Sequence, residues 1–197
     1  MGYKRIRSED HSVSDEDWIT QRIVEDAKAI LRSPMRPKWA ERYSLRDQVV
    51  LSVPGRETIR RPKIDIEIES NVPNRPTYHF EAKRLRTDRT DSVREYLGKG
   101  GLGSFLNELY GRTSDEAGML GYVQSGNPLN WAQNLAAKLS NAPINPYRLI
   151  DGGTWIAYRV IASIENTFRT QHSRPNLGPI TLFHRVLDVR SSFAGAE

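Results

Sequence analysis

Two segments in which apolar and polar residues alternate constrain the fold of this chain more than any other feature. They cover Arg61–Ile68 and Thr77–Leu85. A period of two residues is typical of β-strands that bury one face. Between them, residues Asn71–Tyr78 include two prolines, which favour a turn. The sequence therefore predicts a β-hairpin.

The predicted hairpin brings charged side chains of both strands onto one face. In the first strand the isoleucines share one face and the acidic residues share the other: Ile64, Ile66 and Ile68 against Asp65, Glu67 and Glu69. In the second strand the same alternation separates Tyr78, Phe80 and Ala82 from His79, Glu81 and Lys83. We therefore expect Asp65 to lie near Glu81 and Lys83.

Two adjacent carboxylates beside a lysine are suited to phosphodiester hydrolysis. Without a cation, Asp65 and Glu81 would raise each other's pKa. Mg²⁺ prefers oxygen ligands and keeps several waters, and it makes bound water a better nucleophile. Lys83 would orient or deprotonate that water, or offset charge on the phosphate. The three side chains thus predict a metal-dependent phosphodiesterase.

At these residues the chain resembles the PD-(D/E)xK nuclease superfamily, which has the restriction-endonuclease-like fold. Asp65 stands at the position of the first aspartate of the motif, and Glu81-Ala82-Lys83 matches its E-x-K half. Pro62 lies three residues before Asp65, whereas the motif places proline next to the aspartate. The resemblance covers about residues 14–124 in the order of elements. It implies an α/β fold with a mixed central sheet flanked by helices.

The resemblance also implies a ligand set for the metal. Asp65, Glu81 and the carbonyl of Ala82 would hold Mg²⁺, for which Mn²⁺ could substitute. Members of the superfamily often add an acidic residue from the first helix, here expected from Ser14 to about Leu31 because of its capping-box pattern. Asp26 projects from the edge of the buried face of that helix and is the geometric candidate. The usual glutamate of the family favours Glu25 instead.

Basic residues near the predicted site favour a polyanionic substrate. The chain carries 29 Lys and Arg against 24 Asp and Glu, a net charge of +5. We expect the residues closest to the site to contact nucleic acid: Arg61, Lys63, Arg84, Arg86 and Lys99. DNA is the expected substrate. Target choice would come from loops and a homodimer, or from a partner such as a helicase or other ATPase, as in an effector of bacterial defence.

Other interpretations of the same residues stay open. A solvated strand face often alternates acids and bases for cross-strand pairing, with no catalytic role. A non-catalytic nucleic-acid-binding or assembly subunit could keep the fold and its charges. An RNase on the same scaffold would leave no short signature of ribose recognition. The histidines show no metal-binding spacing, and His79, on the face of Glu81, is the exception to test.

The remaining segments predict the organisation of the chain. Residues 1–13 are expected to form a flexible leader, and 14–197 one domain with a core over about 14–124 and an extension over 125–197. We expect further strands over 45–53 and 117–123, helices over 104–110 and 127–139, and a hairpin of 168–173 with 180–189. Without cysteine and without an apolar run of about 20 residues, a cytoplasmic location is expected.

Overall fold

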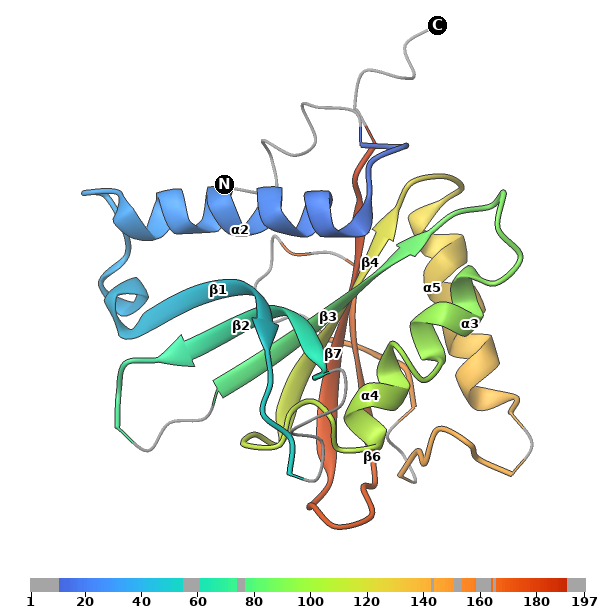
Figure 1. The fold of residues 1–197 in the computed structure, drawn as a ribbon. Helices are drawn as coiled ribbons and strands as arrows, with labels where there is room; N and C mark the ends of the chain where they lie inside the picture. Colours follow the sequence, from blue (N-terminus) through green and yellow to red (C-terminus); the bar gives the residue numbers. More distant parts are fainter. Residues whose placement is uncertain are drawn as a thin grey trace, which may run out of the picture.

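A computed structural model describes residues 11–54, 61–73, 77–142, 144–150, 154–158, 164 and 166–190. Across these ranges the chain forms a seven-stranded mixed sheet flanked by helices, so the predicted α/β class is confirmed (Figure 1). The strands are β1 (Tyr43–Val50), β2 (Lys63–Ser70), β3 (Thr77–Leu85), β4 (Glu116–Val123), β5 (Ile156–Ala157), β6 (Thr167–His172) and β7 (Ile180–Asp188). The helices are α2 (Glu16–Arg32), the short 3-10 helix η1 (Lys38–Arg42), α3 (Ser92–Leu97), α4 (Leu102–Leu106) and α5 (Pro128–Ser140).

The sheet has the strand order β1-β2-β3-β4-β7-β6-β5. Its centre is parallel, because β3 pairs with β4 and β4 pairs with β7 in that sense. Both flanks are antiparallel, as in the predicted β2–β3 hairpin. A parallel β3–β4 pair needs a crossover, which α3 and α4 supply.

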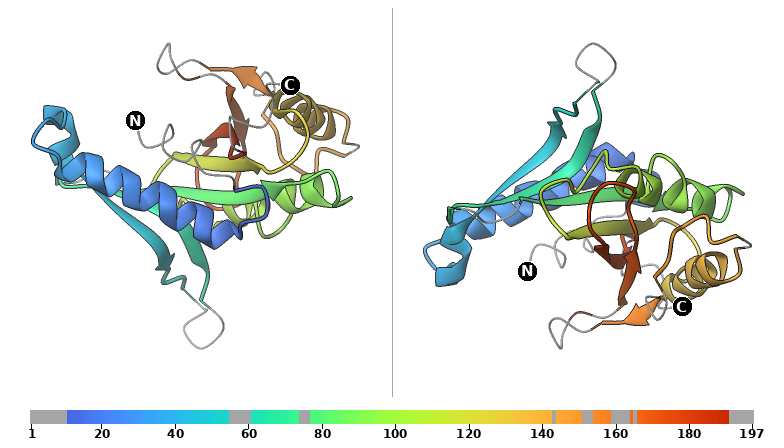
Figure 2. Two further views of the ribbon diagram at one scale, coloured as in Figure 1. Left: turned by 90° about the horizontal axis from the view of Figure 1, so that it is seen from above. Right: turned by 90° about the horizontal axis from the view of Figure 1, so that it is seen from below.

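Alternation along the central strands gives the sheet two apolar faces. On one face Ile19 of α2 packs with Ala82 and Tyr122. On the other face Met119 and Val123 belong to the larger cluster under α3, α4 and α5. Figures 1 and 2 show α2 lying over the β1–β3 part of the sheet, with α3, α4 and α5 gathered on the side of its N-terminal end.

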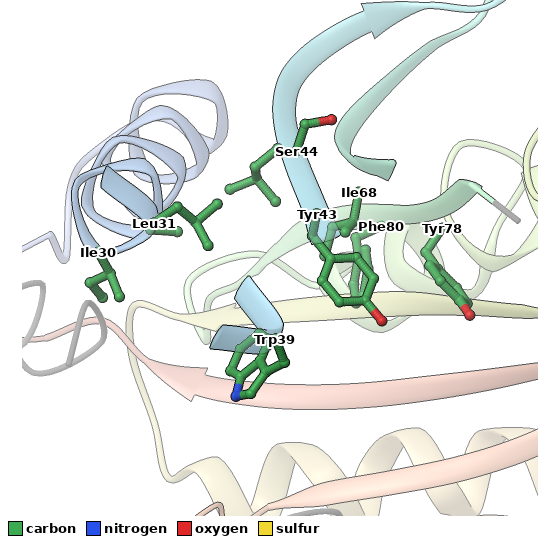
Figure 3. A pocket seen from close by; sticks show the side chains of 10 residues that line it. Ile30, Leu31, Trp39, Tyr43, Ser44, Ile68, Tyr78 and Phe80 are labelled. Atoms are coloured by element: carbon green, nitrogen blue, oxygen red, sulfur yellow. The ribbon is translucent and has the colours of Figure 1, made fainter. Parts of the chain in front are cut away.

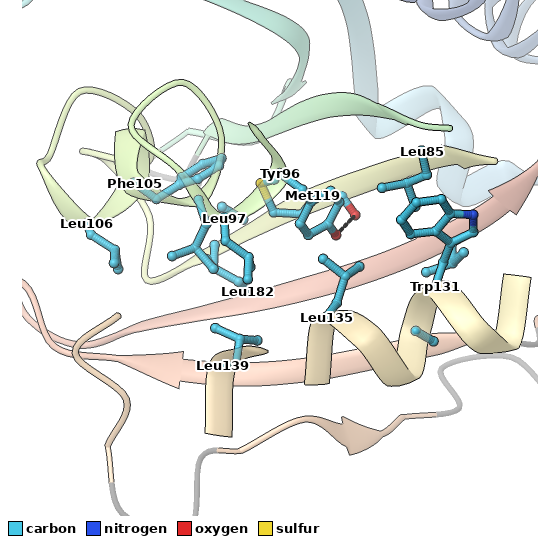
Figure 4. Packing of buried hydrophobic residues seen from close by; sticks show 14 of the residues in the cluster. Leu85, Tyr96, Leu97, Phe105, Leu106, Met119, Trp131, Leu135, Leu139 and Leu182 are labelled. Carbon is cyan, nitrogen blue, oxygen red and sulfur yellow. Dashed lines mark hydrogen bonds between the residues drawn. The ribbon is translucent and has the colours of Figure 1, made fainter. Parts of the chain in front are cut away.

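The larger cluster is the main core of the protein. Trp131, Leu135 and Leu139, spaced by one helical turn along α5, turn toward the sheet as expected, and Leu135 is fully buried (Figure 4). Asn127 caps this helix by accepting hydrogen bonds from the backbone amides of its first turn. The helix predicted after Asn127 is therefore confirmed.

Some elements differ from the prediction. The helix expected over 104–110 ends at Leu106, and Glu108 has a φ of 59°, a left-handed conformation that a helix cannot include. The hairpin expected in the C-terminal extension is β6–β7, and β7 lies inside the sheet beside β4. Of the expected leader, residues 1–10 lie outside the described residues, and the amide of His11 donates to the carbonyl of Val189 over 3.2 Å. No described helix has the length and apolarity that a membrane crossing requires.

Candidate active site at the edge of β3

The candidate site forms where β2 and β3 separate. Their backbone pairing extends from Glu69↔Thr77 to Ile66↔Phe80, whereas β3 continues along β4 as far as Leu85. Residues 81–85 of β3 therefore have an edge that no strand of the described residues covers. A buried backbone amide needs an acceptor, and side chains supply it here.

Two carboxylates from other elements bind this edge. Oδ2 of Asp65 accepts a hydrogen bond from the Ala82 amide over 2.7 Å. Oε2 of Glu16, in the first turn of α2, accepts one from the Arg84 amide over 3.0 Å. Charge-assisted bonds of this kind are stronger than neutral ones. They fix both carboxylates relative to β3.

Lys83 connects these groups. Its ammonium donates to Oε1 of Glu81 over 2.8 Å, to the Ala82 carbonyl over 2.5 Å and to Oε1 of Glu16 over 2.9 Å. The structure thus brings together the three residues that sequence reasoning placed in one site, and it adds Glu16. We call Asp65, Glu81, Lys83 and Glu16 the β3-edge site.

Two carboxylates of the β3-edge site are buried, unlike those of an ordinary charged strand face. Asp65 is 7% exposed and Glu81 is 4% exposed. Burying a carboxylate is costly unless it is paired or binds a cation. Cross-strand pairing on a solvated face therefore does not describe these residues.

Burial shifts the pKa values of the site. Desolvation, with the charge of Asp65 added to it, raises the pKa of Glu81 to about 8, although Lys83 opposes the shift. Burial also raises the pKa of Asp65. Burial alone would lower the pKa of Lys83, but the charges of Glu81 and Glu16 outweigh it and raise that pKa. The site therefore has more carboxylates than a single ammonium can neutralise.

The donor atoms of the site fit a hard divalent cation. Oε2 of Glu81 is buried and has no hydrogen-bond partner among the described residues, so one oxygen of the cluster is unsatisfied. Asp65 and the Ala82 carbonyl provide further oxygen atoms beside it, the type of ligand that Mg²⁺ prefers. Among the described residues no group of three or more His, Cys, Asp or Glu side chains is arranged to hold a metal. Two carboxylates and a carbonyl, completed by water, make a smaller set.

The helical carboxylate at the site is Glu16, which sequence reasoning missed. Asp26 and Glu25, the two expected candidates, lie about 15 Å farther along the axis of α2 at 1.5 Å per residue. Glu25 instead accepts a hydrogen bond from Gln21 over 3.2 Å on the exposed side of the helix. The signal in the sequence is the position of Glu16 in the first helical turn, although the helix dipole by itself favours an acid there.

Gln48 is a second residue that sequence reasoning missed. Its amide Nε2 lies 3.3 Å from Oδ1 of Asp65 and 3.3 Å from Oδ1 of Asp17. Its φ is 54°, a left-handed conformation that is uncommon in a strand. The strained backbone of β1 therefore aims an amide at the carboxylate of Asp65.

His79 belongs to a neighbouring polar pair. Its Nδ1 accepts a hydrogen bond from the Gly111 amide over 3.0 Å, so Nε2 carries the proton and donates to Glu67 over 3.2 Å. Burial lowers the pKa of His79 even though Glu67 acts in the opposite direction. His79 therefore holds the β2–β3 pair together as a neutral ring.

The expected nucleic-acid contacts fall into two groups. Arg84 is paired with Asp15 over 3.3 Å and Arg86 with Asp88 over 2.5 Å. The other three are exposed and have no ion pair within the described ranges: Arg61, Lys63 and Lys99. Lys63 is anchored through its carbonyl, which accepts a hydrogen bond from the Tyr110 hydroxyl over 2.8 Å.

Comparisons with known proteins do not extend this picture. No family model, no curated protein and no solved structure matches the chain. The residues of the β3-edge site therefore carry the functional interpretation.

Proposed function

We propose that this protein is a metal-dependent phosphodiesterase, an endonuclease that cuts DNA at the β3-edge site. The observation that carries the proposal is the pair of buried carboxylates Asp65 and Glu81 beside Lys83, in which one oxygen of Glu81 has no partner among the described residues. Mg²⁺, or Mn²⁺ in its place, would be held by Asp65, Glu81 and the Ala82 carbonyl. Glu16 is the acidic contribution of the first helix.

The cation would supply an activated water and polarise a phosphate oxygen. Burial raises the pKa of Glu81 to about 8, and a bound cation would lower this pKa and favour the loss of the proton. Lys83 remains an ammonium because two carboxylates surround it. It is therefore suited to orient the attacking water and to offset charge on the phosphate, and it is not suited to accept a proton.

Gln48 and the backbone of β3 position the carboxylates. The amide of Ala82 and the side chain of Gln48 donate to different oxygens of Asp65, so its orientation is fixed from two sides. Fixed orientation matters because a misplacement of about 1 Å at a catalytic group can cost about 100-fold in rate.

The proposed substrate is DNA, contacted by the exposed cations Arg61, Lys63 and Lys99. The described residues between 43 and 188 contribute their strands to one sheet, with no second sheet for target recognition. Target choice would then come from a second copy of the chain or from a helicase or other ATPase. An effector of bacterial defence acting in the cytoplasm fits that arrangement.

Cleavage assays test the proposal. Purified protein is mixed with plasmid, linear duplex, single-stranded DNA and RNA in Mg²⁺, Mn²⁺ or EDTA, beside Asp65→Ala and Lys83→Ala. Lys138→Ala, an exposed lysine on α5, is the matched control. We expect metal-dependent cutting of DNA that falls about 100-fold or more in the two site variants, the usual effect of removing a charge-stabilising group.

Three outcomes would count against parts of the proposal. Full cutting by Asp65→Ala and Lys83→Ala would exclude the β3-edge site as the catalytic centre. Cutting of RNA alone would replace DNA as the substrate. Binding of nucleic acid without cutting in any metal would indicate a non-catalytic binding subunit.

A further inference from the structure

A second surface feature lies on the α2 side of the sheet. A groove of about 520 Å³ opens between the C-terminal half of α2, η1 and the strands β1, β2 and β3 (Figure 3). The residues that line it are almost all apolar: Ala27, Ile30, Leu31, Trp39, Tyr43, Ser44, Leu45, Ile68, Tyr78 and Phe80. We call it the α2 groove. Its volume is in the range of small-molecule sites, about 300–1,000 Å³.

Aromatic rings distinguish the α2 groove from a simple gap in packing. Trp39, Tyr43, Tyr78 and Phe80 all contribute to the lining. Trp39 is 63% exposed, and its ring lies 6.3 Å from that of Tyr43. In Figure 3 the hydroxyl groups of Tyr43 and Tyr78 point in the same direction. The groove thus offers ring faces for stacking.

Three basic residues stand next to lining residues in the sequence: Arg32 after Leu31, Lys38 before Trp39 and Arg42 before Tyr43. Arg32, Lys38 and Arg42 are exposed, and none of them has an ion pair within the described part of the chain. Arg42 follows Trp39 by three residues in the 3-10 helix, and residues at that spacing lie above one another. The acid in the same helix, Glu41, is already paired with Arg36 over 3.0 Å. The unpaired charge beside the groove is therefore positive, which favours an anionic ligand.

We propose that the α2 groove binds an unstacked base of a single-stranded nucleic acid, while the three cations contact its phosphates. Aromatic stacking beside a basic surface is the usual way in which proteins bind single strands. The proposal rests on the proposed function in taking nucleic acid as the ligand. An apolar peptide or a second copy of the chain would have no need for the cations.

The groove and the β3-edge site share a strand. Tyr78 and Phe80 line the groove, and Glu81 follows directly. At about 3.3 Å per residue, Tyr78 lies about 17 Å from Lys83 along β3. Because side chains alternate along a strand, Glu81 and Lys83 face the side of β3 opposite to Tyr78 and Phe80, so the groove and the β3-edge site lie on the two sides of one strand.

Binding measured without cleavage tests the proposal. Fluorescently labelled oligothymidylate is titrated with the full chain in EDTA, and anisotropy is recorded for wild type, Trp39→Ala and Trp39→Phe. Leu129→Ala is the matched control, because Leu129 is an exposed apolar residue on α5. The same strand with abasic residues separates base stacking from phosphate contact. Thymidine monophosphate as a competitor separates binding of a strand from binding of a free nucleotide.

We expect Trp39→Ala to weaken binding about 5- to 150-fold, the effect of losing one stacked base. Trp39→Phe and Leu129→Ala should bind within about twofold of wild type, and the abasic strand should bind weakly to all four proteins. Replacing Lys38 and Arg42 by alanine should lower the salt dependence of binding. A circular dichroism spectrum confirms that each variant is folded.

Equal affinity of Trp39→Ala and wild type overturns the proposal. So does self-association of wild type that Trp39→Ala abolishes while oligonucleotide binding stays unchanged, because the groove would then be an interface between copies. Equal competition by the free mononucleotide overturns the single-strand ligand. If Trp39→Ala binds the oligonucleotide as wild type does and still cleaves in the presence of metal, only the proposal for the groove is wrong. If binding depends on Trp39 but wild type does not cleave, only the proposed function is wrong.

Discussion

The raised pKa of Glu81 predicts that stability falls as the pH rises. Burial moves this pKa from 4.5 to about 8 in the folded protein. Between these values the folded state binds more protons than the unfolded state, so the free energy of unfolding decreases with increasing pH. Each unit of pKa corresponds to 1.36 kcal/mol, which gives about 3 kcal/mol of lost stability at pH 7 and about 5 kcal/mol above pH 8.

Glu81→Gln isolates this effect, because glutamine keeps the shape of the side chain and does not ionise. We expect the variant to be more stable than wild type at pH 8, with a difference that shrinks to near zero at about pH 5. Asp65, whose pKa is also raised, contributes a slope of the same sign to both proteins, so it largely cancels in the difference. The loss of the partner of Lys83 will reduce the gain, and about 2 kcal/mol at pH 8 is a reasonable expectation.

Urea denaturation in EDTA, followed by circular dichroism at several pH values between 5 and 8, measures the difference. Glu69→Gln is the matched control, since Glu69 lies on β2 and its side chain is 48% exposed. Adding Mg²⁺ should flatten the slope of wild type and change that of Glu81→Gln less, because a cation stabilises the ionised carboxylate of Glu81. A wild-type minus variant difference that does not change with pH would refute the electrostatic account of the site.

Three further predictions test other parts of the structure. In thermal denaturation, Gln48→Gly should be more stable than Gln48→Ala by about 1 kcal/mol, because glycine adopts a φ of 54° without strain. Equal stabilities of the two variants would contradict the left-handed backbone at residue 48. Gly118→Ala should cost about 1–3 kcal/mol, since an added Cβ would fall on the ring of Phe80, whereas Gly100→Ala meets no atom within 4 Å and should be close to neutral. Burial lowers the pKa of His172 from 6.5 to about 4, so its ring should stay neutral in the folded state. Its contribution to stability is therefore lost as the pH falls from 6.5 to about 4. An NMR titration in which the ring protons of His172 titrate at an unshifted pKa would contradict this.

Alternation of residue types predicted the elements that position the site. The period of two in β2 and β3 is a local property, and it was enough to place Asp65 near Glu81 and Lys83. The cap at Asn127 and the spacing of leucines in α5 are equally local. These features could be predicted because the residues that determine them lie within one element of secondary structure.

Contacts between distant segments could not be predicted in the same way. Glu16 reaches Lys83 across 67 residues of sequence, and only the docking of α2 on the sheet brings the two together. Alternation also cannot reveal the left-handed residue at Gln48, where β1 departs from a regular strand. The insertion of β7 beside β4 depends on pairing between strands that no short pattern specifies.

Burial of the charged face was likewise invisible in the sequence. A face of alternating acids and bases is read as solvated, yet Asp65 and Glu81 are both less than one-tenth exposed. Segments distant in the sequence pack beside them: Glu16 of the preceding helix accepts a hydrogen bond from the Arg84 amide, and Tyr110 of a following loop donates one to the Lys63 carbonyl. The pKa shifts that make the site chemically distinctive depend on that burial.

The most direct test of the central claim is the rate at which the purified protein cuts supercoiled plasmid in Mg²⁺, measured for wild type beside Lys83→Ala. The β3-edge site predicts cutting that requires the metal and slows about 100-fold or more without the lysine ammonium. Equal rates for the two proteins would contradict the assignment of catalysis to Asp65, Glu81 and Lys83.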